Sequence, residues 1–287
     1  MGYGTTSASV LVAAGFLPAL VSASVHTAEV FTTLVSGVSH VRMGNVDQRM
    51  VLALAAPGIV GGVIGAYALA SLTSGTNMRP VVGAILLLLG VVVLLTALRG
   101  RMVKRRTGKF SKRMLLPLGF VAGAVDAIGG GGWGPVATST LMVSNQTAPR
   151  YVIGSVDLAE FFVTVAIVVT FGLTLGFQSF LWHITLPLLI GGVLIAPVAA
   201  YASSRVPPTL MGVAVGLLLM VLNVKTVSQS LSGVLGLPLP PHFDVLFVAL
   251  VGLIAVLLVI GLLSGEASKR LRKPPLNPHI PRGDKVA

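Results

Sequence analysis

The feature that most constrains this chain is a series of apolar runs, each long enough to cross a lipid bilayer. The hydrocarbon core of a membrane is about 30 Å thick, and a helix needs about 20 apolar residues to span it. Only 10% of the 287 residues are charged, whereas soluble domains carry about 25%. A water-soluble fold is therefore excluded. We predict an all-α membrane protein with about seven full transmembrane helices, at residues 20–41, 48–71, 80–98, 151–176, 181–203, 208–226 and 243–264.

One further apolar segment, residues 115–143, is interrupted in a way that a continuous helix does not tolerate. Four consecutive glycines ending at Gly132 are followed by Trp-Gly-Pro. Glycine and proline both disfavour the interior of a helix. Irregular backbone at membrane depth is tolerated only where it is buried in protein or lines a water-filled cavity. We predict a hairpin here, formed by a broken pair of short, re-entrant helices.

Most of the positive charge, which gives a formal net charge of +12, is concentrated in two polar segments. Fourteen of the twenty basic residues lie at 99–114 and 266–287. Cytoplasmic loops of membrane proteins carry such an excess of Lys and Arg. We predict a cytoplasmic loop and a cytoplasmic C-terminal tail in a multi-pass protein of the bacterial cytoplasmic membrane. Anionic lipid is an expected partner of the basic loop. Nucleic acid is not expected, since no nucleic-acid-binding fold surrounds either segment.

The two halves of the chain are related by an offset of 131 residues. Among the sixteen residues that begin at Pro18, eight are identical to the residue 131 positions later, without a gap. Proline, serine, glutamate and threonine match in register, which apolar composition alone does not explain, so we infer a duplication. The single transmembrane domain, 1–287, then contains a first repeat at 1–98, a second repeat at 115–226 and an extra helix at 243–264.

The charge pattern orients the two repeats in opposite directions. Four full spans separate residue 151 from the cytoplasmic tail, so the hairpin at 115–143 must return to the side from which it entered. Matched segments then run in opposite directions, which is the inverted repeat common among transporters. The first arm of the hairpin has no counterpart ahead of Met1. Either the start is misplaced or the first repeat is open, and the sequence favours neither.

Half of the eight acidic residues lie within apolar segments: Glu29, Asp126, Asp157 and Glu160. Ionisable groups inside a bilayer are costly and mark functional sites by default. Glu29 lies eleven residues after Pro18, which is ~16 Å along a helix and about half of the hydrocarbon thickness. Glu160 lies at the same distance from Pro149, entering from the opposite face. We expect both carboxyls near the midplane.

Polar residues recur at spacings of three and four on the helix face around Glu29, from Ser22 to His40. Two interpretations stay open. The stripe lines a permeation or coupling site, or it makes interhelical hydrogen bonds with protonated carboxyls and binds no ligand. A metal pair of His26 and Glu29 is a weaker alternative, because the second half does not repeat the histidine. The serine, threonine and carboxyl positions of both halves are candidate pathway residues.

The glycine break offers backbone N–H groups at the starts of short helices, where anions bind. No Arg or Lys lies mid-span, so we expect backbone donors, hydroxyls and His26 to hold an anion; close packing of the glycines is the alternative. Bulky residues at Gly131 or Gly132 should then block transport and spare the fold. The complete set of candidate pathway residues is Ser24, His26, Glu29, Thr33, Asp126, Gly131, Gly132, Trp133, Ser155, Asp157 and Glu160.

Several of these residues belong to short motifs with a recognisable order along the chain. The motifs are Gly2-Tyr3-Gly4, Ser24 to Glu29, Ser36 to His40, Gly44 to Asp47, Gly61-Gly62 with Gly65-Ala66, Asp126 to Pro135 and Ser155 to Glu160. Over residues 2–226 the chain resembles the TauE/SafE family of sulfite and sulfonate exporters. The resemblance implies export of sulfite, sulfoacetate or related sulfur oxyanions, and of other small anions. The absent first arm departs from the family pattern.

We expect a transporter, not an enzyme, that exports a small sulfur-containing anion by alternating access without a cofactor or metal. The inside-negative potential favours anion efflux: a dianion gains ~4.6 kcal/mol per 100 mV. An importer or a channel for another small anion is an alternative. An intramembrane enzyme using His26 and Glu29 is a second one, although the chain has no His-Glu-x-x-His or Gly-x-Ser-x-Gly motif. A non-transporting scaffold would leave the carboxyls unexplained.

Overall fold

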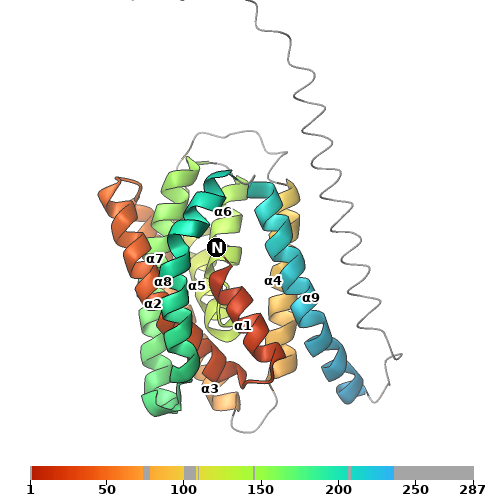
Figure 1. The fold of residues 1–287 in the computed structure, drawn as a ribbon. Coiled ribbons are helices and arrows are strands. Elements are labelled where there is room, and N and C mark those ends of the chain that lie inside the picture. The colour runs from red at the N-terminus through yellow and green to blue at the C-terminus, as the bar shows by residue number, and fades with distance from the viewer. Residues whose placement is uncertain are drawn as a thin grey trace, which may run out of the picture.

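The computed structural model describes residues 2–73, 78–99, 108, 110–144, 146–205 and 208–235, and every regular element in these ranges is a helix (Figure 1). In chain order the helices are α1 (Tyr3–Ala13), α2 (Pro18–Arg42), α3 (Gln48–Thr73), α4 (Arg79–Arg99), α5 (Lys112–Gly129), η1 (Gly134–Thr138), α6 (Ser139–Ser144), α7 (Pro149–Leu175), η2 (Phe177–Ser179), α8 (Trp182–Arg205) and α9 (Pro208–Leu235). The predicted helix at 243–264, the tail at 266–287 and most of the loop at 99–114 lie outside the described residues.

Within the described residues, three helices are long and apolar enough to cross a membrane by length and composition: Gln48–Leu72 in α3, Arg79–Leu98 in α4 and Pro149–Leu175 in α7. Shorter apolar helical stretches lie in α8 and α9, at Trp182–Leu194 and Gly212–Ser228. α2 has 25 residues but carries buried polar side chains along its length. The helical membrane architecture therefore agrees with the sequence, and the count of seven full spans stays a prediction.

The offset of 131 residues relates the helix boundaries as well as the sequence. Adding 131 to the bounds of α1 gives 134–144, the combined span of η1 and α6. The same addition moves α2 to 149–173, α3 to 179–204 and α4 to 210–230, close to the observed bounds of α7, α8 and α9. α2 and α7 both begin with a proline, whose fixed φ and missing N–H suit the first turn of a helix.

Matched helices pack against each other in antiparallel pairs. Figure 1 shows α2 and α7 on one side of the molecule and α4 and α9 on the other, with α1 and α5 between them. In both pairs the residue number rises along one helix as it falls along the other, in the contacts Gly37 with Leu158, His40 with Gly154, Gly83 with Thr226 and Ala97 with Gly212. α3 also packs on α7, as its counterpart α8 packs on α2.

The glycine-rich segment is a hairpin, as the sequence predicts. α5 ends at Gly129, its C-cap Gly130 has a left-handed φ of 68°, and Gly131 follows with a φ of 136°. The chain then turns into η1 and α6. Beyond the two arms, the Gly108 amide donates to the Gln146 carbonyl at 3.1 Å, so the segment returns to the side from which it entered. Only glycine adopts both of these backbone conformations without strain.

α3 and α5 approach each other along a line of glycines. A Cβ added at Gly61 would collide with the Phe120 carbonyl oxygen, and one added at Gly123 would collide with the Gly58 carbonyl oxygen. Lipid is as apolar as the side chains, so helices in membranes associate largely through such close packing of small residues. The hairpin is thereby held against the bundle by backbone-to-backbone contact.

We expect Gly123→Ala to destabilise the protein, because its methyl group has only backbone to displace. Overpacking of this kind costs about 1–3 kcal/mol, which thermal unfolding of the purified protein in detergent would register as a lower Tm. Gly191→Ala in α8 is the control, since nothing lies within 4 Å of a Cβ at that position. Equal Tm values for the two variants would contradict the packing described for α3 and α5.

Candidate functional site

Asp126, near the end of α5, organises the backbone of the glycine break. Its carbonyl oxygen accepts the amides of Gly130 and Gly131. Its carboxylate Oδ1 accepts the amides of Gly132 and Trp133, at 2.6 and 2.8 Å. A carboxylate is the favoured cap for such amides, because it satisfies donors at the positive end of a helix. The expectation that the Gly132 and Trp133 amides hold a transported anion is therefore wrong: Asp126 already occupies them.

The second oxygen of Asp126 binds His26, which lies on α2 and is completely buried. The distance from His26 Nε2 to Asp126 Oδ2 is 3.2 Å. His26 Nδ1 lies 2.7 Å from the Ser22 carbonyl oxygen, and a carbonyl only accepts, so Nδ1 carries a proton and donates it. Ser22 Oγ in turn donates to the Ala127 carbonyl at 2.6 Å. His26 and Ser22 together fasten the end of α5 to α2.

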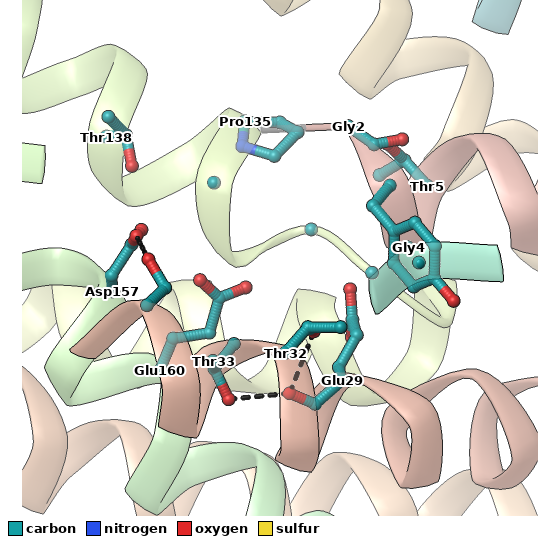
Figure 2. Close-up of a pocket in the computed structure, with 16 residues that line it drawn as sticks. Gly2, Gly4, Thr5, Glu29, Thr32, Thr33, Pro135, Thr138, Asp157 and Glu160 are labelled. Atoms are coloured by element: carbon teal, nitrogen blue, oxygen red, sulfur yellow. Dashed lines mark hydrogen bonds between the residues drawn. The ribbon is translucent and has the colours of Figure 1, made fainter. Parts of the chain in front are cut away.

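A cavity of about 290 Å³ lies beside this junction, between α1, α2, α7, α8 and the glycine break. Figure 2 shows the Glu29 and Glu160 carboxyls pointing from two helices into it. Asp157 lies at one end, where its Oδ2 accepts a hydrogen bond of 2.6 Å from Ser36. The lining residues are Gly2, Tyr3, Gly4, Thr5, Glu29, Thr32, Thr33, Ser36, Gly131, Gly132, Gly134, Pro135, Thr138, Asp157, Glu160 and Gly192.

Accessibility along the cavity falls from one end to the other. The exposed fraction of the side chain is 29% for Asp157 and 19% for the neighbouring His40, but 6% for Glu29 and 0% for His26. The accessible end therefore lies where α2 ends and α7 begins. Arg42 is in the last turn of α2, so the more exposed end of this row of side chains lies near a basic residue.

Comparison with known proteins shows the family to which this chain belongs. The family model described as "Sulfite exporter TauE/SafE" matches residues 1–226. This chain belongs to the TauE/SafE family. It is 42% identical over 228 residues to the "Probable membrane transporter protein YtnM" of Bacillus subtilis (strain 168), an alignment that covers 79% of this chain and 76% of that protein. No solved structure matches the chain. The resemblance of the motifs is thus confirmed, and the protein is a membrane transporter.

The cavity of this TauE/SafE protein contains six of the eleven predicted pathway residues. They are Glu29, Thr33, Gly131, Gly132, Asp157 and Glu160. His26 and Asp126 lie directly behind Glu29, and the distance from His26 Nε2 to Glu29 Oε2 is 3.9 Å. Trp133 is fully buried and donates through its indole N–H to the Val156 carbonyl at 3.1 Å. These three residues support the lining and do not form it.

Ser24 and Ser155, which are matched by the offset of 131, are placed away from the cavity. Ser24 Oγ accepts the Leu181 amide at 3.0 Å, and Ser155 Oγ accepts the Asp47 amide at 2.8 Å. Leu181 and Asp47 each precede the first residue of a helix, in the other repeat from the serine. The two serines thus connect the repeats to each other, and neither is among the residues that line the cavity.

Gly131 packs so closely against α1 that it tolerates no side chain. A Cβ at this position would collide with the backbone of Gly4 and Thr5, and the φ of 136° is strained for any other residue. A bulky side chain there must displace α1, so the expectation that such variants keep their fold is wrong for Gly131. At Gly132 the nearest atoms to an added Cβ are 3.1 to 3.3 Å away, a tight contact in which the neighbouring atoms must shift by a few tenths of an ångström.

Sequence reasoning missed four hydroxyls of the lining and the contribution of α1 to the site. Two of the hydroxyls belong to α1, on Tyr3 and Thr5, and two belong to other helices, on Thr32 and Thr138. The Tyr3 hydroxyl donates to the Leu188 carbonyl at 2.8 Å. None of these four residues is repeated at the offset of 131 as the same residue type. The only signal for α1 was the Gly-Tyr-Gly motif shared with the family.

The lining has an unusual charge balance for a protein that moves an anion. Its described residues include three carboxyls and six hydroxyls but no Lys, Arg or His. An ionised carboxylate only accepts hydrogen bonds and repels an anion, whereas a protonated carboxyl donates one. The cavity therefore accommodates an oxyanion best when protons are bound to the carboxyls. Among the described residues, no group of three or more potential ligands is arranged to hold a metal ion.

Proposed function

We propose that this transporter exports a small sulfur-containing oxyanion, such as sulfite, sulfoacetate or a related organosulfonate, through the Glu29 and Glu160 cavity. The observation that carries the proposal is the position of these two carboxyls. They are matched by the offset of 131, lie on the antiparallel pair α2 and α7, and face one hydroxyl-lined cavity. Hydroxyls and protonated carboxyls are suitable donors for the oxygens of a sulfonate or sulfite.

Alternating access is the mechanism proposed for this movement. Two repeats of opposite direction allow one half to rock against the other around a central site. The antiparallel contacts of α2 with α7 and of α4 with α9 support such an inverted relation between the repeats. Among the lining carboxyls, Asp157 is the one beside the end of α2 that carries Arg42, and we propose that this end of the cavity opens to the cytoplasm.

The energetics support export. If one proton leaves with a dianion, a net charge of −1 crosses the membrane, and the inside-negative potential still favours efflux by ~2.3 kcal/mol per 100 mV. A monoanion that carries one proton moves without net charge and follows its own concentration gradient and that of protons. Proton-linked binding is therefore compatible with outward transport of either kind of substrate.

A flux assay in proteoliposomes tests the proposal. Proteoliposomes are loaded with sulfite, sulfoacetate, sulfate or nitrate. They should lose sulfite or sulfoacetate faster than protein-free vesicles do, and they should lose nitrate more slowly than they lose these two anions. Gly191→Ala protein should behave as wild type, because a Cβ added at Gly191 meets no atom within 4 Å. Release of none of the sulfur-containing anions, from vesicles that contain folded protein, would contradict the proposed substrate class.

The proposed orientation makes a separate prediction. Because the chain has no cysteine, single cysteines at Gly108 and Gly283 report on topology without a background. Both lie in the basic segments that we assign to the cytoplasm, so an impermeant maleimide should label neither in intact cells and both after permeabilisation. Labelling of either cysteine in intact cells would overturn the orientation, and with it the direction proposed for transport.

A further inference from the structure

The amides of the glycine break are occupied by Asp126, and a second set of backbone donors faces the cavity. α1 begins at Tyr3, and its N-cap, Gly2, makes no side-chain capping bond. The Thr6 amide bonds the Gly2 carbonyl at 3.0 Å. The amides of Tyr3, Gly4 and Thr5 therefore belong to the first turn, whose N–H groups have no intrahelical acceptor. All three residues line the cavity.

Glu29 is aimed at this first turn. Its side chain is only 6% exposed, and its Oε2 is buried without a hydrogen-bond partner. The Gly4 backbone amide faces the carboxyl, and a Cβ added at Gly4 would collide with Oε1. Figure 2 shows the carboxyl of Glu29 directed toward Gly4. A glycine is thus required where α1 and the Glu29 side chain meet.

We infer that the first turn of α1 is the oxyanion subsite, and that the ionised Glu29 carboxylate occupies it until a proton allows an external anion to take its place. The ligand class is a small oxyanion, a sulfonate or sulfite. Unpaired amides and the helix dipole attract a negative group to such a helix end. Glu29 is then an internal competitor of the substrate. This inference rests on the proposed function and names the subsite within the same cavity.

The charged neighbours of Glu29 fit this role. The described titratable groups around it, one helix after another, are Tyr3 of α1, His26 of α2, Asp126 of α5, and Asp157 and Glu160 of α7. His26 is held by Asp126 at 3.2 Å and lies farther from Glu29, at 3.9 Å. A protonated His26 is therefore closer to Asp126 than to Glu29, and Glu160 adds a further carboxyl to the cavity. A second anion cannot join the ionised carboxylates at low cost.

Equilibrium binding to the full chain in lipid nanodiscs tests the inference. The probes are methanesulfonate and sulfate, which keep one charge state from about pH 5.5 to 8.5. For wild type, affinity should fall as pH rises, by up to ~tenfold per pH unit for one linked proton. Glu29→Gln should bind equally at every pH, and should exceed wild type in affinity at the alkaline end. Glu160→Gln should bind more tightly than wild type at each pH but keep the slope.

Each other result overturns the inference. If Glu29→Gln retains the slope of wild type, Glu29 is not the competitor. If Glu160→Gln loses the pH dependence of binding as Glu29→Gln does, the total charge of the cavity determines the affinity, and occupation of the α1 end by Glu29 does not. If folded wild-type protein binds neither probe at any pH, the proposed function fails as well, which distinguishes the two failures.

Glu29→Ala provides a second route that does not depend on the glutamine side chain. Removing the carboxylate vacates the α1 end, so free acetate should compete with methanesulfonate in this variant at pH 8.5 and should not do so in wild type. Thermal unfolding of the same samples would establish that both proteins are folded. Absence of acetate competition in folded Glu29→Ala would overturn the assignment of the α1 turn as the subsite.

Discussion

Asp126→Ala is expected to lower the stability of the protein by about 3–5 kcal/mol, the cost of removing one partner from a buried charged pair. The Gly132 and Trp133 amides lose the oxygen that accepts them, and His26, which is fully buried, loses its carboxylate. Each orphaned buried donor carries its own desolvation penalty. Thermal unfolding in detergent should show a large fall in Tm, and limited proteolysis should cut within the glycine break.

Asp157→Ala is the matched control for this substitution. Asp157 also lies in a helix of the site, but its side chain is 29% exposed and accepts one hydrogen bond, from Ser36. We expect a loss of about 1 kcal/mol or less there, since water replaces the lost partner. If Asp126→Ala and Asp157→Ala have similar Tm values, the carboxylate does not hold the hairpin in place.

The second large effect is expected in the pH dependence of transport. Glu29→Gln and Glu160→Gln keep the shape of the protonated side chain and its ability to donate, but remove its ionisation. Glu29→Gln should therefore flatten the pH profile of the initial export rate between about pH 5.5 and 8.5, whereas Glu160→Gln should keep the slope of wild type. Wild type should change by up to ~tenfold per pH unit where one proton is linked to binding.

The alanine variants separate this role from packing. If the two carboxyls only connect helices, the glutamine variants should transport as wild type does at every pH, while Glu29→Ala and Glu160→Ala lose stability. Unchanged pH profiles in both glutamine variants would remove the proton linkage and leave the packing role. Measuring the four variants in one vesicle preparation, with folded protein quantified for each, distinguishes these outcomes.

The sequence was sufficient to predict the helices, because their signals are local. Apolar runs and the glycine break predicted roughly where the described helices begin and end. The offset of 131 residues predicted which helices correspond, and the pairing of α2 with α7 follows the same relation. The prediction that Glu29 and Glu160 lie close together rests on the proposed inverted repeat, and both residues line the cavity.

The chemistry of the break could not be predicted, because it depends on contacts between distant residues. Asp126 and His26 are 100 positions apart, and Ser155 and Asp47 are 108 apart. No periodicity relates such pairs. A carboxylate beside glycines is equally consistent with a ligand site and with an internal cap, and only the hydrogen bonds of Oδ1 decide between them.

The α1 helix was underestimated for a similar reason. Its sequence is short and contains no charged residue, so nothing in it indicates a binding site. Its importance comes from position: the Gly4 backbone lies against both Glu29 and Gly131, and two glycines are required for that approach. The family motif Gly2-Tyr3-Gly4 carried this information, without the physical reason for it.

The most direct test of the account is the location of the bound anion. Selenite is a heavier oxyanion of the same shape as sulfite, and its selenium can be located by anomalous scattering in crystals grown near pH 5.5. We expect one peak in the cavity, within hydrogen-bond reach of the Gly4 amide and between Glu29 and Glu160. A peak outside the cavity, in protein that transports selenite, would show that the anion site lies elsewhere.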